Sequence, residues 1–99
     1  MVYIYEIKRE TYPNYILEKK LLEHKKQYSR EEFEDIVIEA KCKIEEYIEE
    51  YDDDIYNETM ESICDEAEDD YLEAIADYLI EYKDFKRYFA KEAISIFID

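Results

Sequence analysis

The sequence predicts a single α+β domain in which a small N-terminal β-hairpin packs with three acidic α-helices. The first observation is that β-branched and aromatic residues alternate over residues 2–9, which is typical of a strand. The second is that apolar residues recur every three or four positions from Phe33 onward, which is typical of amphipathic helices. The third is the length of 99 residues, which suits one modest hydrophobic core. We assign residues 1–28 to the hairpin and 29–99 to a helical acidic region.

The hairpin continues with a turn at residues 11–14, where proline fixes one backbone dihedral and asparagine tolerates an unusual one. Residues 15–28 fit two patterns, because their apolar positions match both strand alternation and helical spacing. We favour a second strand, since a lone edge strand would need a partner.

The first helix is the most clearly marked element. Ser29 and Glu32 have the spacing of a capping box, and an apolar stripe follows from Phe33 to about residue 51. On a helical wheel, Ile38 and Cys42 fall opposite this stripe, among the acids. We interpret them as covered by a second element; the alternative is an apolar anchor within an acidic contact surface.

The later helices have less definite boundaries. Asp54 is predicted to cap the second helix, which is either one bent helix through residue 83 or two helices broken near Asp69. Apolar residues on both sides after the break predict that its later half is the most buried helix. Asp84 is predicted to cap a short last helix through residues 85–89. Residues 94–98 are either the end of that helix or a terminal strand that pairs with residues 2–7, and we favour the strand.

Negative charge is concentrated in residues 31–84. This segment contains 23 acidic residues and three lysines, a local net charge of −20, whereas the whole chain has a net charge of −16. Such a surface repels nucleic acid and anionic membranes and attracts basic surfaces. We therefore expect no direct binding to nucleic acid or membrane, and a function carried out by the acidic surface.

Motifs for catalysis and cofactor binding do not occur in the sequence. Because the chain has no glycine, glycine-rich phosphate loops are excluded. His24 is the single histidine and is interpreted as structural. Residues 52–58 are rich in oxygen ligands but lack the glycine turn and spaced glutamate of an EF-hand calcium loop. We expect a protein that is not an enzyme and that has no cofactor and no metal.

The cysteines and the hydropathy pattern indicate the compartment. Cys42 and Cys64 are not in Cys-x-x-Cys spacing, and no apolar N-terminal segment indicates secretion. No apolar run approaches the ~18 residues that a membrane-spanning helix needs. We expect a cytoplasmic protein, in the host cytoplasm if it is phage-encoded, and whether the two cysteines touch stays open.

The acids follow helical spacing in two rows. In a continuous helix, five carboxylates between Glu66 and Glu81 would align over ~22 Å, and a second row from Glu58 to Asp69 would lie on the adjoining face. Like charges at these spacings cost a helix a few tenths of a kcal/mol per pair, which interleaved lysines would have recovered. We therefore treat the acids as a contact surface. The candidate partner-binding residues are Glu45, Glu46, Glu49, Asp52, Asp53, Glu58, Glu61, Asp65, Glu66, Asp69, Asp70, Glu73, Asp77, Glu81, Tyr51, Tyr56 and Ile38.

A small, strongly acidic, tyrosine-rich chain without a catalytic motif resembles the loose class of phage-encoded inhibitors that includes anti-CRISPR proteins and DNA-mimic anti-restriction proteins. The resemblance covers the whole chain and rests on composition and charge pattern. It implies a stoichiometric inhibitor that binds a basic nucleic-acid-binding host protein, either a CRISPR-Cas effector or a restriction-type nuclease. The acidic helical surface would mimic DNA and block nucleic-acid binding.

A second hypothesis is an adaptor or antitoxin-like interaction module that does not mimic nucleic acid. Ile38 and Cys42 would then form an apolar contact, because dimer interfaces are more apolar than mimic surfaces. The sequence is compatible with a monomer or a homodimer.

Overall fold

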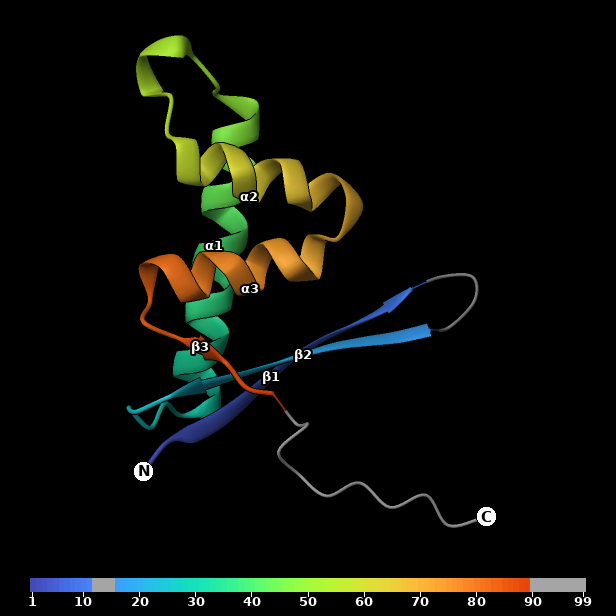
Figure 1. The fold of residues 1–99 in the computed structure, drawn as a ribbon, viewed down its shortest axis with the longest axis vertical. Helices are drawn as coiled ribbons and strands as arrows, with labels where there is room; N and C mark the ends of the chain where they lie inside the picture. Colours follow the sequence, from blue (N-terminus) through green and yellow to red (C-terminus); the bar gives the residue numbers. More distant parts are fainter. Residues whose placement is uncertain (12–15, 90–99) are drawn as a thin grey trace.

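The computed structural model describes residues 1–11 and 16–89 and has an α+β fold (Figure 1). A three-stranded antiparallel sheet with strand order β1-β2-β3 lies at one end of the long helix α1, and α2 and α3 are stacked across that helix. The elements in chain order are β1 (Tyr3–Thr11), β2 (Ile16–His24), α1 (Arg30–Glu49), the short 3₁₀ turn η1 (Asp53–Ile55), α2 (Glu58–Asp69), α3 (Tyr71–Tyr82) and β3 (Lys86–Arg87).

The predicted hairpin is confirmed. β1 and β2 pair in a register that runs from Tyr3 opposite His24 to Thr11 opposite Ile16, so the ambiguous second segment is a strand. Successive side chains of a strand point to opposite faces. One face carries Ile7 and the fully buried Leu22 into the core, where α3 contacts both strands.

Helix α1 begins as the sequence predicts. Ser29 Oγ accepts a hydrogen bond from the Glu32 amide, and the Glu32 carboxylate accepts one from the Ser29 amide, so both halves of the capping box are present. Ala40 and Ile44 of the apolar stripe are fully buried. The expectation that a second element covers Ile38 and Cys42 is wrong. In the described part of the chain Ile38 is 49% exposed and Cys42 is exposed, because α2 and α3 both lie on the side of the apolar stripe.

The sequence left open whether the region after α1 is one bent helix or two helices. The structure has two helices, α2 and α3. Asp70 ends α2 and also caps α3, since its carboxylate accepts a hydrogen bond from the Glu73 amide at 3.0 Å. The predicted cap at Asp54 is wrong. Asn57 caps α2 by accepting from the Met60 amide at 3.1 Å, because the η1 turn occupies residues 53–55 first.

Helix α3 is the most buried helix, as the apolar residues on both of its sides predict. It contributes six buried residues: Leu72, Ala74, Ile75, Ala76, Tyr78 and Leu79. It lies between the sheet and α1, so two of its faces are covered. The full burial of Leu79 and Phe85 places the centre of the core beneath this helix.

The predicted short helix after Asp84 is wrong. Asp84 has a φ of 63°, a left-handed conformation that aspartate tolerates in a chain without glycine. The chain therefore turns back toward the sheet, Phe85 is buried, and Lys86–Arg87 pairs with β2 as β3. This third strand lies beside β2, whereas the terminal strand predicted at 94–98, beside β1, lies outside the described residues.

His24 makes contacts that fit a structural role. Its Nδ1 accepts a hydrogen bond from the Lys26 amide at 2.9 Å, which leaves Nε2 to donate to the Lys83 carbonyl at 3.0 Å. The ring also packs edge-on against Phe85. His24 thereby ties the end of β2 to the segment between α3 and β3.

Candidate protein-interaction surface

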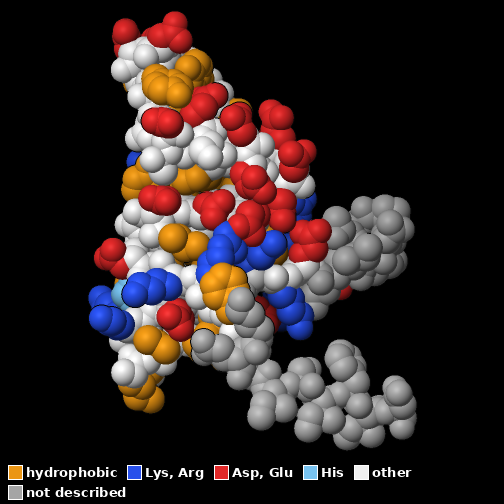
Figure 2. All heavy atoms as spheres, viewed as in Figure 1, with side chains coloured by type: hydrophobic (Ala, Val, Ile, Leu, Met, Phe, Trp, Pro, Cys, Tyr) orange, Lys and Arg blue, Asp and Glu red, His pale blue; other side chains and the backbone are white. Residues whose placement is uncertain are grey.

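The strongest concentration of negative charge lies in residues 45–69, which we call the acidic end. It comprises the second part of α1, the η1 turn and α2, and it contains 13 acidic residues and no lysine or arginine. Figure 2 shows acidic side chains over the upper and right-hand part of the molecule, and most lysines and arginines near the strands below. Figure 1 places η1 farthest from the sheet. The protein is therefore electrically polarised along its length.

Within the acidic end, the Tyr47 side chain connects α1 to the start of α2. Its hydroxyl accepts a hydrogen bond from the Asn57 amide at 3.2 Å and lies 3.1 Å from the Glu61 carboxylate, to which it donates. Because Tyr47 lies on α1 and the other two residues lie at the start of α2, this side chain fixes the path of the intervening turn. Within the turn, Asp52 accepts from the Asp54 amide at 3.3 Å.

Four exposed apolar side chains lie among these acids, and we call them the apolar tip: Ile48, Tyr51, Ile55 and Tyr56. Each is between 45% and 56% exposed. The Tyr51 ring contacts the Tyr47 ring at a centroid distance of 5.6 Å, which restrains it. Partial desolvation, together with the charges of Glu61 and Asp53, raises the pKa of the Tyr51 hydroxyl, as expected in a region of negative potential.

A shallow groove of about 330 Å³ adjoins the apolar tip. Its walls include Tyr47 and Ile55 on one side and Tyr78 and Tyr82 of α3 on the other. Glu46 and Glu50 lie at the same groove, and Lys43, which pairs with Glu46 at 3.7 Å, is the cation that lines it. Aromatic and acidic groups together suit the side chain of a partner's arginine or lysine.

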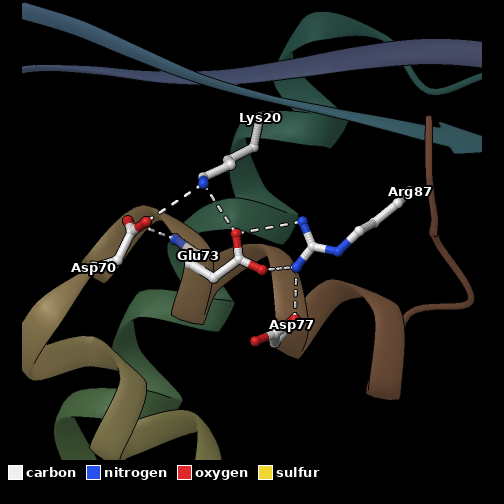
Figure 3. A network of polar contacts seen from close by, with 5 residues as sticks. All are labelled: Lys20, Asp70, Glu73, Asp77 and Arg87. Carbon is white, nitrogen blue, oxygen red and sulfur yellow. Dashed lines mark hydrogen bonds and ion pairs between the residues drawn. The ribbon is translucent and has the colours of Figure 1, made fainter. Parts of the chain in front are cut away.

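The carboxylates of α3 have a different role, as Figure 3 shows. Lys20 of β2 lies 3.3 Å from Asp70 and 3.0 Å from Glu73. Arg87 of β3 pairs with Glu73 and also lies 2.8 Å from Asp77. Burial and the charges of Glu66 and Glu81 nevertheless raise the pKa of Asp77 above its ordinary value. These ion pairs join α3 to the sheet and neutralise the middle of the predicted five-carboxylate row.

The structure therefore separates the candidate residues into groups. Glu45, Glu46, Glu49, Asp52, Asp53, Tyr51, Tyr56, Glu58, Glu61, Asp65, Glu66 and Asp69 lie together in the acidic end. Asp70, Glu73 and Asp77 lie in the network with Lys20 and Arg87, and Glu81 is exposed near the end of α3. Ile38 is exposed on the earlier part of α1. The continuous row from Glu66 to Glu81 does not form, because the chain bends at Asp70.

Sequence reasoning did not single out Ile48 and Ile55, which complete the apolar tip. Ile48 fits the apolar stripe by spacing, but α1 extends past the elements that pack on it, so the residue is 53% exposed. The absence of any base from residues 45–69 was the available signal for this region as a whole.

Metal binding has no preformed site in the described residues: no three His, Cys, Asp or Glu side chains are close enough together to hold an ion. None of the described helices combines the length and apolar character needed to span a bilayer. Comparison of the chain with protein-family models, curated protein sequences and solved structures finds no match.

Proposed function

We propose that the protein is a stoichiometric inhibitor that uses its acidic end to bind the basic, nucleic-acid-binding surface of a partner protein. The candidate partners are a CRISPR-Cas effector and a restriction-type nuclease. The observation that carries the proposal is the combination of 13 acids, no cation and an exposed apolar tip in residues 45–69.

Electrostatics supports this role in two ways. DNA carries one negative charge per ~1.7 Å of its axis, and its binding proteins line their grooves with lysine and arginine. Within the acidic end, helix α2 has 12 residues and is ~18 Å long, which is about half a duplex turn. The acidic end can therefore meet several basic residues at once, and long-range attraction accelerates the encounter.

The apolar tip supplies the contact that charge alone does not. Exposed charge pairs are worth little individually and weaken with salt. A few side chains at the centre of an interface, enriched in tyrosine, tryptophan and arginine, contribute most of its binding energy. Tyr51 and Tyr56 are suited to this contact because tyrosine offers a large area for a small loss of conformational entropy.

The test compares three immobilised baits in a candidate host lysate: the wild type, an acidic-end variant and a matched control. The acidic-end variant is Glu49→Lys/Asp65→Lys/Glu68→Lys, whose exposed sites lie in the later parts of α1 and α2, where lysine suits the helix dipole. The control, Glu6→Lys/Glu10→Lys/Asp35→Lys, changes net charge equally at exposed sites outside the acidic end.

We expect the wild type and the control, but not the acidic-end variant, to retain a nucleic-acid-binding protein that elutes with salt and is displaced by duplex DNA or guide RNA. Equal capture by all three baits would contradict the proposal. So would a partner that resists salt and ignores nucleic acid.

A second candidate function is an adaptor or antitoxin-like module, and the exposure of Ile38 and Cys42 favours it. These side chains lie on the face of α1 away from its buried stripe, where a second copy can contact them. Light scattering after size-exclusion chromatography tests this directly. A wild-type dimer that Ile38→Glu converts to a monomer supports the module. If the wild type and the variant are both monomeric, a dimer through this face is excluded.

A further inference from the structure

A second surface has the opposite character to the acidic end, and we call it the basic groove. It has a volume of about 820 Å³ and lies between β1, the first part of α1 and the start of α3. Ile7, Phe33, Val37 and Ile75 give it an apolar lining. The groove is large enough for several side chains of a bound segment.

Four cations line this groove: Lys8, Arg9, Arg30 and Lys41. Only two acids, Glu6 and Glu34, line it with them, so its local charge is positive in a chain whose net charge is −16. No ion pair between described residues involves any of the four cations. The Arg9 guanidinium instead lies 5.8 Å from the centre of the Tyr71 ring. These charges are available to an acidic ligand.

The backbone of β1 forms one wall of the groove. In the sheet order β1-β2-β3, this strand lies at an edge, and among the described residues it pairs only with β2. Residues 6–9 of β1 line the groove, and the amides and carbonyls on the outer edge of this stretch pair with no other described residue. An edge of this kind accepts an extended peptide as an added strand, with backbone hydrogen bonds giving affinity and side-chain pockets giving specificity.

We propose that the basic groove binds an extended acidic segment of a partner protein, which pairs with the outer edge of β1. The segment places apolar side chains on Phe33 and Val37, and its carboxylates lie against Arg30 and Lys41. This proposal is independent of the function proposed for the acidic end, because the two surfaces share no residue. A protein with both surfaces can hold a basic and an acidic partner at once.

The probe is a fluorescein-labelled heptapeptide, DEVIVED, with capped ends, whose acids flank an apolar centre. Its binding is followed by fluorescence anisotropy at low salt, with KKVIVKK as the opposite-charge control. We expect saturable binding of the acidic peptide that weakens as salt is added. Absence of saturable binding up to millimolar protein would overturn the proposal.

Charge reversal locates the site. Arg30→Glu/Lys41→Glu is expected to weaken binding about tenfold or more, because two attractive charges are lost and their reversal adds repulsion. Lys25→Glu/Lys86→Glu makes the same change in net charge at exposed sites outside the groove and should leave affinity within twofold of wild type. All four sites are exposed, and circular dichroism checks that both variants are folded. Equal weakening by the two variants would overturn the assignment to the groove.

Backbone methylation tests strand addition. Alternate amides of a strand point to opposite sides, so two versions of the peptide, N-methylated at alternate positions, block either the β1-facing or the outward-facing amides. We expect one version to bind like the parent and the other to lose binding. Binding that both versions retain, or that both lose, would contradict pairing with β1. A dimer of the protein that Arg30→Glu/Lys41→Glu dissociates would assign the groove to a second copy and also overturn the proposal.

Discussion

Replacement of Arg87 by leucine is expected to destabilise the fold by about 1–2 kcal/mol. The guanidinium bridges Glu73 and Asp77, and the three side chains are 21–37% exposed, so each pair lies between the surface and buried cases. A surface pair is worth up to ~1 kcal/mol, and hydrogen bonds to charged groups about 1.5–3 kcal/mol when better shielded. Discounting for the partial exposure leaves about 0.5–1 kcal/mol for each of the two contacts.

The assay is urea unfolding followed by circular dichroism at neutral pH and low salt. In a parallel thermal unfolding experiment on a domain of this size, a loss of 1 kcal/mol corresponds to a fall of about 4–8 °C in Tm. Lys86→Leu is the matched control, since Lys86 is the exposed neighbour in β3 and no ion pair within the described part of the chain involves it. We expect that control to change stability by less than ~0.5 kcal/mol.

A double-mutant cycle isolates the pair. The coupling energy between Arg87→Leu and Asp77→Asn is expected to be about 0.5–1 kcal/mol and to decrease in high salt. A coupling energy near zero, or equal effects of the Arg87 and Lys86 replacements, would refute the view that this network joins α3 to the sheet. Reversing the charges of Asp70, Glu73 and Asp77 would replace these ion pairs by repulsion and destabilise the fold further, so a loss of partner binding in that variant would not by itself locate the binding surface.

Three further predictions concern the acidic end and the core. Tyr47→Phe should lower the free energy of unfolding by about 1 kcal/mol, measured by urea titration, because the hydroxyl bridges α1 to the start of α2; an unchanged midpoint would contradict this role. The pKa of Asp77 is raised on folding, so the folded chain binds this proton more readily than the unfolded chain does, and the free energy of unfolding should increase as pH falls through the raised pKa toward the ordinary value of an aspartate. Asp77→Asn should flatten that pH dependence. If the pH profiles of the variant and the wild type are parallel, the pKa of Asp77 is not raised. Burial, with the charges of Glu61 and Asp65, raises the pKa of the Cys64 thiol, whereas Cys42 is exposed. Iodoacetamide should therefore modify Cys42 much faster than Cys64 in the folded protein, and equal rates by mass spectrometry would contradict the burial of Cys64.

The sequence predicts the elements that local patterns define. Side-chain alternation identifies β1, and the capping box and apolar stripe identify α1. The sequence also offers a break near Asp69 as one of two alternatives, and in the structure Asp70 caps α3 there. The errors lie where chain direction depends on distant contacts. Asp84 has the sequence of a helix cap, but burial of Phe85 beneath α3 turns the chain toward β2 and makes a strand instead.

The sequence predicts the acidic residues of the candidate site but not which of them form ion pairs. The acidic residues are visible in the sequence, and their number fixes the net charge at −16. Which of them have partners is not visible, because Lys20 and Arg87 lie outside the acidic segment and reach α3 only through the sheet. Ile48 and Ile38 follow helical patterns, yet their exposure depends on where α2 and α3 cross α1.

The sequence by itself determined the fold class, the start of α1 and the location of the negative charge, because propensity, capping and periodicity act between near neighbours in the chain. Only the tertiary structure decided that Asp70, Glu73 and Asp77 are paired with cations of the sheet, that an apolar tip lies among the acids of residues 45–69 and that four cations line a groove beside β1. The physical reason is that ion pairing and burial depend on distance through space. Residues far apart in the chain become neighbours only when the sheet and helices pack.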